Sequence, residues 1–320
     1  MRWMDRIGRR LKLRDLHILM AVAQRGSMAK AARDLAISQP VVSKTIADLE
    51  RAIGVSLLDR TRHGVEPTQY GRALLKHGVA IFDELKQSVR EIEFLADPTI
   101  GELRVGCSES ISSGILPPVV HRFSQQYPRV ILEMGPGDTD AMLRELRDRS
   151  LDLILVRTGE DFLADHFTED LNFEVLLNDE SAVVVGLESR WARRRKIDLA
   201  ELVNERWILA APDTENHKLV AEAFRARGLA MPNVSMNTLS VHLRTYLLAT
   251  GQFITVFPRS ILRLYGDRFS LKVLPIDLPV RPWLVAIVTL KNRTLSPVVE
   301  RFIECAREVM MTLEKAKKPR

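Results

Sequence analysis

The chain has 320 residues, of which 46% are hydrophobic and 28% charged, with a formal net charge of +6. This composition is typical of a globular protein, and the length suggests two or three domains that each bury a core without disulfides. No segment reaches the roughly 18 apolar residues of a membrane span, and the two cysteines, Cys107 and Cys305, lie in no metal-ligand spacing. These features argue against a membrane protein, a disulfide framework and a metal centre, and they favour a reducing, cytoplasmic setting without cofactors.

The excess positive charge lies at the start of the chain. Residues 1–67 hold 13 Lys and Arg against 7 Asp and Glu, whereas residues 68–320 hold 34 of each. A short basic domain joined to a neutral one suits a polyanionic partner such as nucleic acid. A basic solvated surface without a partner would give the same balance, so charge alone leaves both interpretations open.

The first 23 residues have the pattern of a secretory signal peptide, because a basic stretch precedes the apolar run at 16–23. Asp15 and His17 interrupt that run, however. Leu16, Leu19, Met20 and Ala23 recur at helical spacing, and we therefore favour a helix of the folded protein.

Residues 13–67 are predicted to form short helices separated by tight turns. Ser27 is placed to cap one helix, and Ser38 to cap the next, with Pro40 in its first turn, where a missing N–H costs nothing. The core stripe expected on this second helix consists of Val42, Ile46, Leu49 and Ile53.

The opposite face of the second helix begins with Gln39, Ser43 and Lys44. A recognition helix meets base edges and phosphates near its N-terminus, where Gln can pair with adenine and Lys with guanine or phosphate. Two short extended runs around residues 62–64 predict a hairpin wing. Arg60, Arg62 and His63 would there meet the sugar-phosphate backbone.

A long linker helix is predicted over residues 68–96. It should end at Asp97 and Pro98, because proline and the residue before it resist helix continuation. Its apolar positions are Leu74, Leu75, Val79, Ile81, Phe82, Leu85, Val89, Ile92 and Leu95. A helix of this length cannot bury so broad a stripe in its own small domain, so a partner helix is the favoured cover. Packing against the rest of the same chain is the alternative.

After Gly101, short apolar runs alternate with amphipathic segments centred on 112–126, 139–149 and 216–228. This alternation indicates an α/β domain with mainly parallel sheets.

A series of motifs runs through the N-terminal region. They are Ala31-Ala32-Arg33-Asp34-Leu35, Ser38-Gln39-Pro40-Val41-Val42-Ser43, Leu49-Glu50, Gly54, Leu57, Arg60, Thr68 and Gly71. In order and spacing these motifs resemble those of the LysR-type transcriptional regulators. The chain departs from the commonest family pattern at Leu58, Pro67 and Tyr70. The resemblance implies a winged helix-turn-helix at 1–67 that binds double-stranded operator DNA, and a linker helix at 68–97 that pairs two subunits. It also implies a homo-oligomer, either a dimer or a tetramer, with four subunits as the usual assembly.

The same resemblance implies that residues 101–320 form a two-lobed, periplasmic-binding-protein-like effector domain. Lobe one is expected at about 101–173 and 280–320, lobe two at about 174–279, and a small-molecule effector between them. Residues that lie at or just after strand ends are then the candidate contacts. They are Ser108, Ser110, Thr139, Pro212, Thr214 and Phe257.

Two interpretations of these contacts remain open, since strand–helix junctions often carry ordinary capping residues. Hydroxyls and backbone N–H groups at helix starts suit an organic acid. The acidic Glu109, Asp138 and Asp213 would equally suit a sugar-like ligand. Residues 236–244 and 251–253 weakly resemble the subgroup that contains the galactose-binding-protein regulator, which leaves the effector undetermined.

Three other functions find less support in the sequence. The Ser27–Lys30 segment matches a Ser-x-x-Lys nucleophile motif without its companion motifs, so we expect no enzyme. A solute-binding protein of a transporter would leave residues 30–97 without a purpose. A redox regulator would need an exposed thiolate, which nothing around Cys107 or Cys305 indicates.

Overall fold

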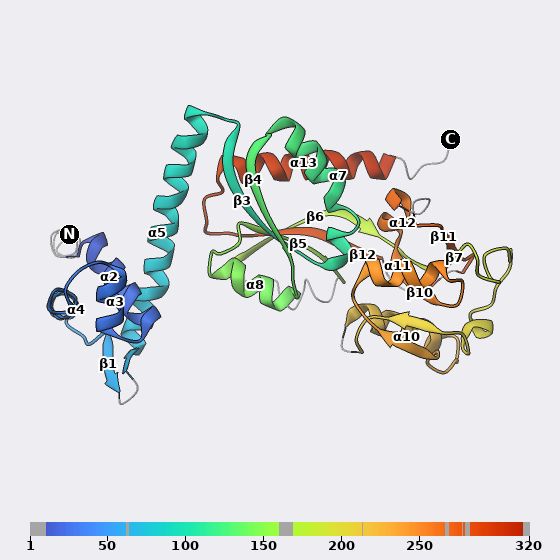
Figure 1. Ribbon diagram of the computed structural model, residues 1–320, viewed down its shortest axis with the longest axis horizontal. Coiled ribbons are helices and arrows are strands. Elements are labelled where there is room, and N and C mark those ends of the chain that lie inside the picture. The colour runs from blue at the N-terminus through green and yellow to red at the C-terminus, as the bar shows by residue number, and fades with distance from the viewer. Residues whose placement is uncertain are drawn as a thin grey trace. The chain divides into compact units, whose positions relative to one another are not determined.

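The computed structural model describes residues 11–61, 64–159, 169–212, 214–265, 269–276, 278 and 282–315. The chain divides into two units, Met1–Ser88 and Val89–Arg320, and each is described by itself (Figure 1).

The first unit is a small helical domain with a two-stranded hairpin. Helices α2 (Leu13–Arg25), α3 (Met28–Asp34) and α4 (Gln39–Ile53) precede strands β1 (Leu58–Thr61) and β2 (Gly64–Pro67), and helix α5 (Gln69–Ala96) begins here. Val42, Ile46 and Leu49 are buried on α4, as predicted. Ile53 is 41% exposed, because the helix ends at this residue and Gly54 then turns the chain away in a left-handed conformation.

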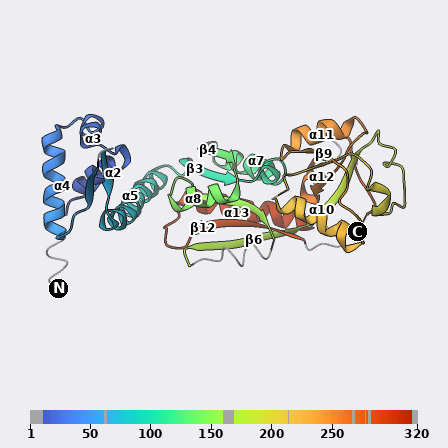
Figure 2. The same ribbon diagram turned by 90° about the horizontal axis from the view of Figure 1, so that it is seen from below.

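Lobe one of the second unit is built on a five-stranded sheet. Its elements are β3 (Ile100–Cys107), α6 (Glu109–Ser112), α7 (Leu116–Gln126), β4 (Arg129–Pro136), α8 (Thr139–Arg147), β5 (Leu153–Thr158), β6 (Leu171–Asp179), β12 (Trp283–Leu290) and α13 (Pro297–Lys315). The strand order is β4-β3-β5-β12-β6. Helices α7 and α13 pack on one face and α8 on the other (Figures 1 and 2).

Lobe two repeats this three-layer plan. It contains β7 (Ser181–Gly186), the 3-10 helix η1 (Leu199–Leu202), β8 (Trp207–Leu209), α10 (Glu215–Ala226), β9 (Val234–Asn237), α11 (Val241–Ala249), β10 (Ile254–Pro258), α12 (Arg259–Tyr265) and β11 (Leu271–Val273). The strand order is β11-β7-β10-β8-β9. The core around α10 covers one face, and residues of α11 and α12 cover the other.

Both sheets are mixed rather than mainly parallel. In lobe one, β3 pairs in parallel with β4 and β5, while β12 pairs antiparallel with β5 and β6. In lobe two, β8 pairs in parallel with β9 and β10, while β7 pairs antiparallel with β10 and β11. The expectation from strand–helix alternation therefore holds for half of the strand pairings in each sheet. The antiparallel pairings come from β12 in lobe one, where the chain returns to that sheet, and from β7 in lobe two.

Two boundaries differ from the expected positions. Strand β6 pairs with β12 of lobe one along its whole length, from Leu171 to Asp179. The expected lobe boundary at 173/174 therefore falls inside a strand of lobe one. The helix expected at 112–126 is two helices, α6 and α7. Pro117 and Pro118 explain the break, because proline is tolerated in the first turn of a helix and not in its interior.

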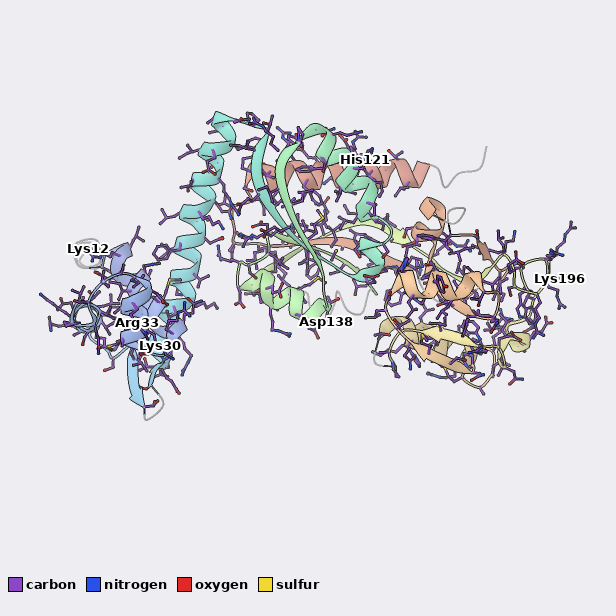
Figure 3. All side chains as sticks on the ribbon, in the orientation of Figure 1. Lys12, Lys30, Arg33, His121, Asp138 and Lys196 are labelled. Atoms are coloured by element: carbon purple, nitrogen blue, oxygen red, sulfur yellow. The ribbon has the colours of Figure 1, made fainter. Side chains whose placement is uncertain are left out.

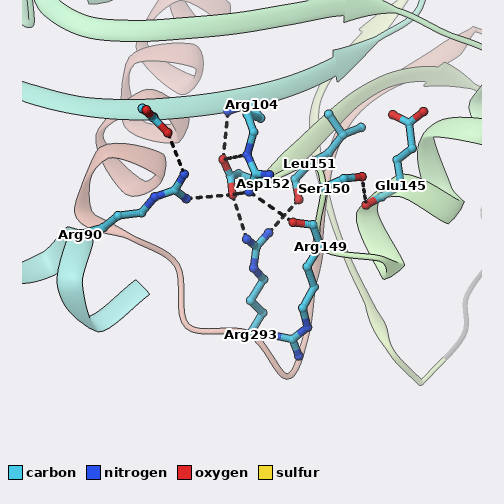
Figure 4. A network of polar contacts seen from close by, with 9 residues as sticks. Arg90, Arg104, Glu145, Arg149, Ser150, Leu151, Asp152 and Arg293 are labelled. Carbon is cyan, nitrogen blue, oxygen red and sulfur yellow. Dashed lines mark hydrogen bonds and ion pairs between the residues drawn. The ribbon is translucent and has the colours of Figure 1, made fainter. Parts of the chain in front are cut away.

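A buried carboxylate ties the end of α5 to lobe one (Figure 4). Asp152 Oδ1 lies 2.8 Å from Arg293, 3.0 Å from Arg104 and 3.4 Å from Arg90 on α5. Burial raises the pKa of Asp152, but hydrogen bonds from Arg104 and the charges of Arg104 and Arg293 outweigh it and hold that pKa below its usual value. The ion cluster therefore depends on an ionised Asp152.

Candidate DNA-binding surface and effector cleft

The turn between α3 and α4 places the two helices of the expected DNA-binding motif. Ser27 Oγ accepts a hydrogen bond from Lys30 N at 3.4 Å, which confirms the predicted cap of α3. Ala36 takes a left-handed φ of 52°, and Ile37 N donates to Ala32 O at 3.0 Å. This sharp turn sends the chain directly into α4.

Ser38 precedes α4 without forming the side-chain cap that its sequence position suggested. Its carbonyl oxygen instead accepts from Val41 N and Val42 N, at 3.1 and 3.2 Å. The Ser38 side chain is exposed, so its hydroxyl remains accessible to an external partner.

The predicted recognition residues occupy an accessible face at the start of α4. Gln39, Pro40 and Lys44 are exposed and Ser43 is half-buried, while the opposite face of α4 lies in the domain core. The sequence interpretation overlooked Val41, which is 41% exposed on the same first turns. An exposed apolar side chain on a recognition helix suits the methyl group of thymine.

The cations of α3 were also overlooked. Lys30 and Arg33 are both exposed (Figure 3). Since α3 and α4 pack directly on each other, these cations enlarge the basic surface of the helix-turn-helix.

The predicted wing is present as the antiparallel pair β1–β2, in which Arg60 is opposite Val65. Arg62 and His63 lie outside the described residues, as does the side chain of Arg60. Val65 N donates to Gly26 O at 2.9 Å. Gly64 has a φ of +134°, and a Cβ there would lie 2.3 Å from Gly26 O, so this close approach requires glycine.

Eight of the nine apolar positions predicted on α5 fall into two groups, and the ninth, Val79, is half-buried. Leu74, Leu75 and Phe82 pack against the core of the first unit. Five other positions are exposed, namely Ile81 by 42%, Leu85 by 44%, Val89 by 54%, Ile92 by 66% and Leu95 by 73%. We call these five residues the exposed α5 stripe.

In lobe one, the candidate effector contacts lie at two strand–helix junctions. Ser108 and Ser110 flank the start of α6, and their hydroxyl oxygens are 3.3 Å apart. Thr139 is the first residue of α8, and Asp138 rather than Thr139 caps that helix by accepting from Ala141 N at 3.2 Å. All three hydroxyl residues are partly exposed.

Two of the candidate effector contacts in lobe two, Thr214 and Phe257, have structural roles within the lobe. Thr214 Oγ1 donates to Ala211 O at 2.6 Å and accepts from His217 N at 3.4 Å, so it caps α10. Pro212 is exposed. Phe257 is fully buried in the lobe core, which corrects the expectation of a ligand contact, because its ring presents no surface in this arrangement.

The two lobes meet beside Ser108 and Ser110. Glu109 Oε1 accepts a hydrogen bond from Val241 N of α11 at 3.3 Å. A Cβ at Gly114 would lie 2.7 Å from Ile261 of α12. The hydroxyl pair on α6 therefore lies at the seam between the lobes.

Two buried arginines at this seam were missed by the sequence interpretation. Arg157 pairs with Asp179 at 3.5 Å and donates to Ser181 Oγ at 3.1 Å. Arg244 donates to Leu239 O and Val256 O, at 3.2 and 3.4 Å. Burial lowers the pKa of each guanidinium to about 10. A charge inside the apolar segment 241–249 was the available signal for Arg244.

Both cysteines are buried thiols. Burial, together with the charge of Glu109, raises the pKa of Cys107 to about 11, and burial raises that of Cys305. A neutral, buried thiol is a poor nucleophile, so the geometry disfavours the redox interpretation.

Comparison with known proteins agrees with this organisation. The family description "Bacterial regulatory helix-turn-helix protein, lysR family" matches residues 13–72, and "LysR substrate binding domain" matches residues 96–311. GbpR of Azospirillum brasilense is 27% identical over 90% of this chain and 83% of its own length. The small neutral protease regulatory protein of Streptomyces coelicolor is 31% identical over 82% of this chain and 81% of its own length.

Solved structures share the fold. CbnR in complex with its target DNA has a TM-score of 0.53 at 20% identity, covering 94% of this chain and 100% of that one. A full-length OxyR from Pseudomonas aeruginosa has a TM-score of 0.60 at 20% identity, covering 94% of each chain. Within the part that the structure describes, no helix is both long and apolar enough to cross a bilayer. The chain belongs to the LysR family of transcriptional regulators.

Proposed function

We propose that this LysR-type regulator reads operator sequence through Gln39, Ser43 and Lys44, with Val41 as an apolar contact. The observation that carries the proposal is the accessible polar start of α4, opposite a face that Val42, Ile46 and Leu49 bury in the domain core. At base edges in the major groove, Gln and Ser side chains can donate or accept hydrogen bonds, and Lys can donate them. The chain would act where chromosomal DNA lies, in the cytoplasm.

The remaining DNA contacts are proposed to be made with the sugar-phosphate backbone. Ser27 and Ser38 lie at the N-termini of α3 and α4, where backbone N–H groups suit phosphates. Pro40 lies in the first turn of α4 and, having no N–H, would contact the DNA backbone by packing alone. Arg60, Arg62 and His63 would meet the backbone from the wing. Phosphate contacts fix the register of the protein on DNA without reading sequence.

Selection from a randomised duplex library tests this proposal, because the library offers the protein every possible operator sequence at once. The full-length protein should enrich a defined sequence with two related half-sites, as expected of paired helix-turn-helix domains. Enrichment of no sequence at moderate salt would contradict specific recognition.

The exposed α5 stripe is proposed to pair two subunits. The stripe repeats at intervals of four, four, three and three residues, and their average of about 3.5 equals the mean spacing of a helix–helix seam. Its exposure rises to 73% at Leu95, and a partner helix would remove this apolar surface from water.

The effector is proposed to bind at the seam between the lobes, against Ser108, Ser110 and Thr139 from lobe one and against Pro212 and Thr214 from lobe two. The hydroxyl pair on α6 beside the interlobe hydrogen bond of Glu109 supports this location. The ligand would be an organic acid or a sugar-like molecule. A thermal-shift screen of organic acids and sugars tests whether either class binds, since a ligand that binds the folded state raises the melting temperature.

A further inference from the structure

A dense run of cations lies on the surface of lobe two. The segment 190–196 contains Arg190, Arg193, Arg194, Arg195 and Lys196, all exposed, and Lys196 projects outward from the lobe (Figure 3). The even balance of 34 basic and 34 acidic residues over 68–320 concealed this local concentration.

Part of this run borders a hollow with other cations. The hollow has a volume of about 620 Å³. Arg194 and Arg195 come from the segment after β7, Arg259 from the start of α12 and Lys272 from the edge strand β11. Four charged side chains from three places in the sequence therefore meet around one concave surface.

The remaining lining of the hollow is apolar. It consists of Val273, Leu274, Pro275 and Ile276. Leu274 and Ile276 are buried in the core of the lobe, so the floor is held by packing, while the charges stand at the rim.

Carboxylates balance only half of the cations that line the hollow. Arg194 pairs with Glu201 at 2.7 Å and Arg259 with Glu180 at 3.0 Å. Arg195 and Lys272 form no ion pair with any residue that the structure describes. Two cations without a carboxylate partner give this open surface hollow an excess of positive charge.

We propose that this hollow binds a small molecule carrying two or more phosphate groups. Guanidinium groups suit phosphate oxygens because they donate two parallel hydrogen bonds. The volume is in the usual range for small-molecule sites, roughly 300–1,000 Å³, and the apolar floor suits a ring or chain attached to the phosphates. The hollow shares no lining residue with the effector candidates at the seam, so this site is a second input to the regulator.

Isothermal titration of the full-length protein with pyrophosphate at low ionic strength tests the proposal. We expect saturable binding with one site per chain, and at least a ten-fold loss of affinity in the double variant Arg195→Ala/Lys272→Ala. Arg227→Ala is the matched control, because Arg227 is an exposed cation of the same lobe outside the hollow, and it should bind like the wild type. Circular dichroism and thermal melting of each variant check that the fold is retained.

Three outcomes would overturn the proposal. The first is the absence of saturable pyrophosphate binding by the wild type, and the second is undiminished binding by a folded double variant. The third is weaker binding of the double variant to non-specific duplex DNA without any pyrophosphate site, which would assign the cations to the DNA backbone. None of these outcomes bears on recognition through α4, which the randomised-duplex selection measures separately.

Discussion

The side chain of Glu50 accepts hydrogen bonds from the backbone N–H groups of Leu57 and Leu58, at 2.7 and 3.2 Å from Oε1. Glu50 lies in the last turns of α4, and Leu58 is the first residue of β1. One carboxylate therefore links the recognition helix to the wing, the two elements that must meet DNA in a fixed relation.

Replacing Glu50 by Ala should destabilise the first unit. The two N–H groups would lose their acceptor in a partly buried place, and hydrogen bonds to charged groups contribute about 1.5–3 kcal/mol. Glu50→Gln retains one carbonyl acceptor and should cost less. Chemical denaturation of the three proteins measures the effect, and equal unfolding free energies for all three would show that the link contributes nothing.

Asp152 should control the acid stability of the effector unit. Its pKa is held below the usual value in the folded state, so its contribution is present above about pH 4, the ordinary range for an aspartate. That contribution is lost as the pH falls through the lowered folded-state pKa. Denaturation between pH 7 and pH 2 should therefore show a loss of stability that begins below about pH 4.

The variant Asp152→Asn should cost about 3–5 kcal/mol at neutral pH, because it removes the carboxylate that neutralises the buried guanidinium group of Arg293 and the partly buried one of Arg104. It should also weaken the acid dependence. Glu102→Gln is the control, since Glu102 meets Arg90 at 3.4 Å but its side chain is 55% exposed, and exposed pairs contribute under about 1 kcal/mol. A stable Asp152→Asn protein with an unchanged pH profile would refute this account of the cluster.

The exposed α5 stripe should be required for subunit pairing. Leu85→Glu combined with Ile92→Glu places two charges on that surface, and we expect a smaller assembly in analytical ultracentrifugation with the melting of the effector unit unchanged. Lys86→Glu, a charge change at an exposed α5 position beside the stripe, should leave the mass unaltered. An unaltered mass for the double variant would mean that other surfaces assemble the protein.

Ser110→Ala should separate effector response from DNA binding. The substitution removes a hydroxyl from the seam. A lost hydrogen bond of about 1 kcal/mol corresponds to roughly a five-fold lower affinity for the ligand. The unliganded variant should occupy DNA as the wild type does, because Ser110 is remote in sequence from the helix-turn-helix. Titration with a hit from the thermal-shift screen decides this. Undiminished ligand affinity would remove Ser110 from the site, and lost DNA binding would make it a structural residue.

Local patterns predicted the first unit well because local chemistry determines it. The cap at Ser27 and the buried stripe at Val42, Ile46 and Leu49 need only neighbouring residues. Sequence reasoning failed where distant segments meet. Phe257 ends a strand like a ligand contact, yet the guanidinium of Arg244 lies 4.5 Å over its ring inside the core.

The basic hollow shows the same limit. Lys272 carries no signal in the sequence, and only the folding of β11 brings it to Arg194 and Arg195. A charge run is evident from the residues of 193–196, but its convergence with other cations depends on tertiary structure.

The most direct test of the central claim is the base preference of Gln39→Ala, measured by the same randomised-duplex selection as the wild type. Gln39 lies on the accessible start of α4, and losing a side chain that pairs with a base costs about 1–3 kcal/mol at that base. The account predicts that preference relaxes at one position in each half-site while the others persist. Arg60→Ala should instead weaken binding to all DNA sequences alike and make the DNA affinity less dependent on salt. An unchanged preference in Gln39→Ala at every position would contradict recognition through the start of α4.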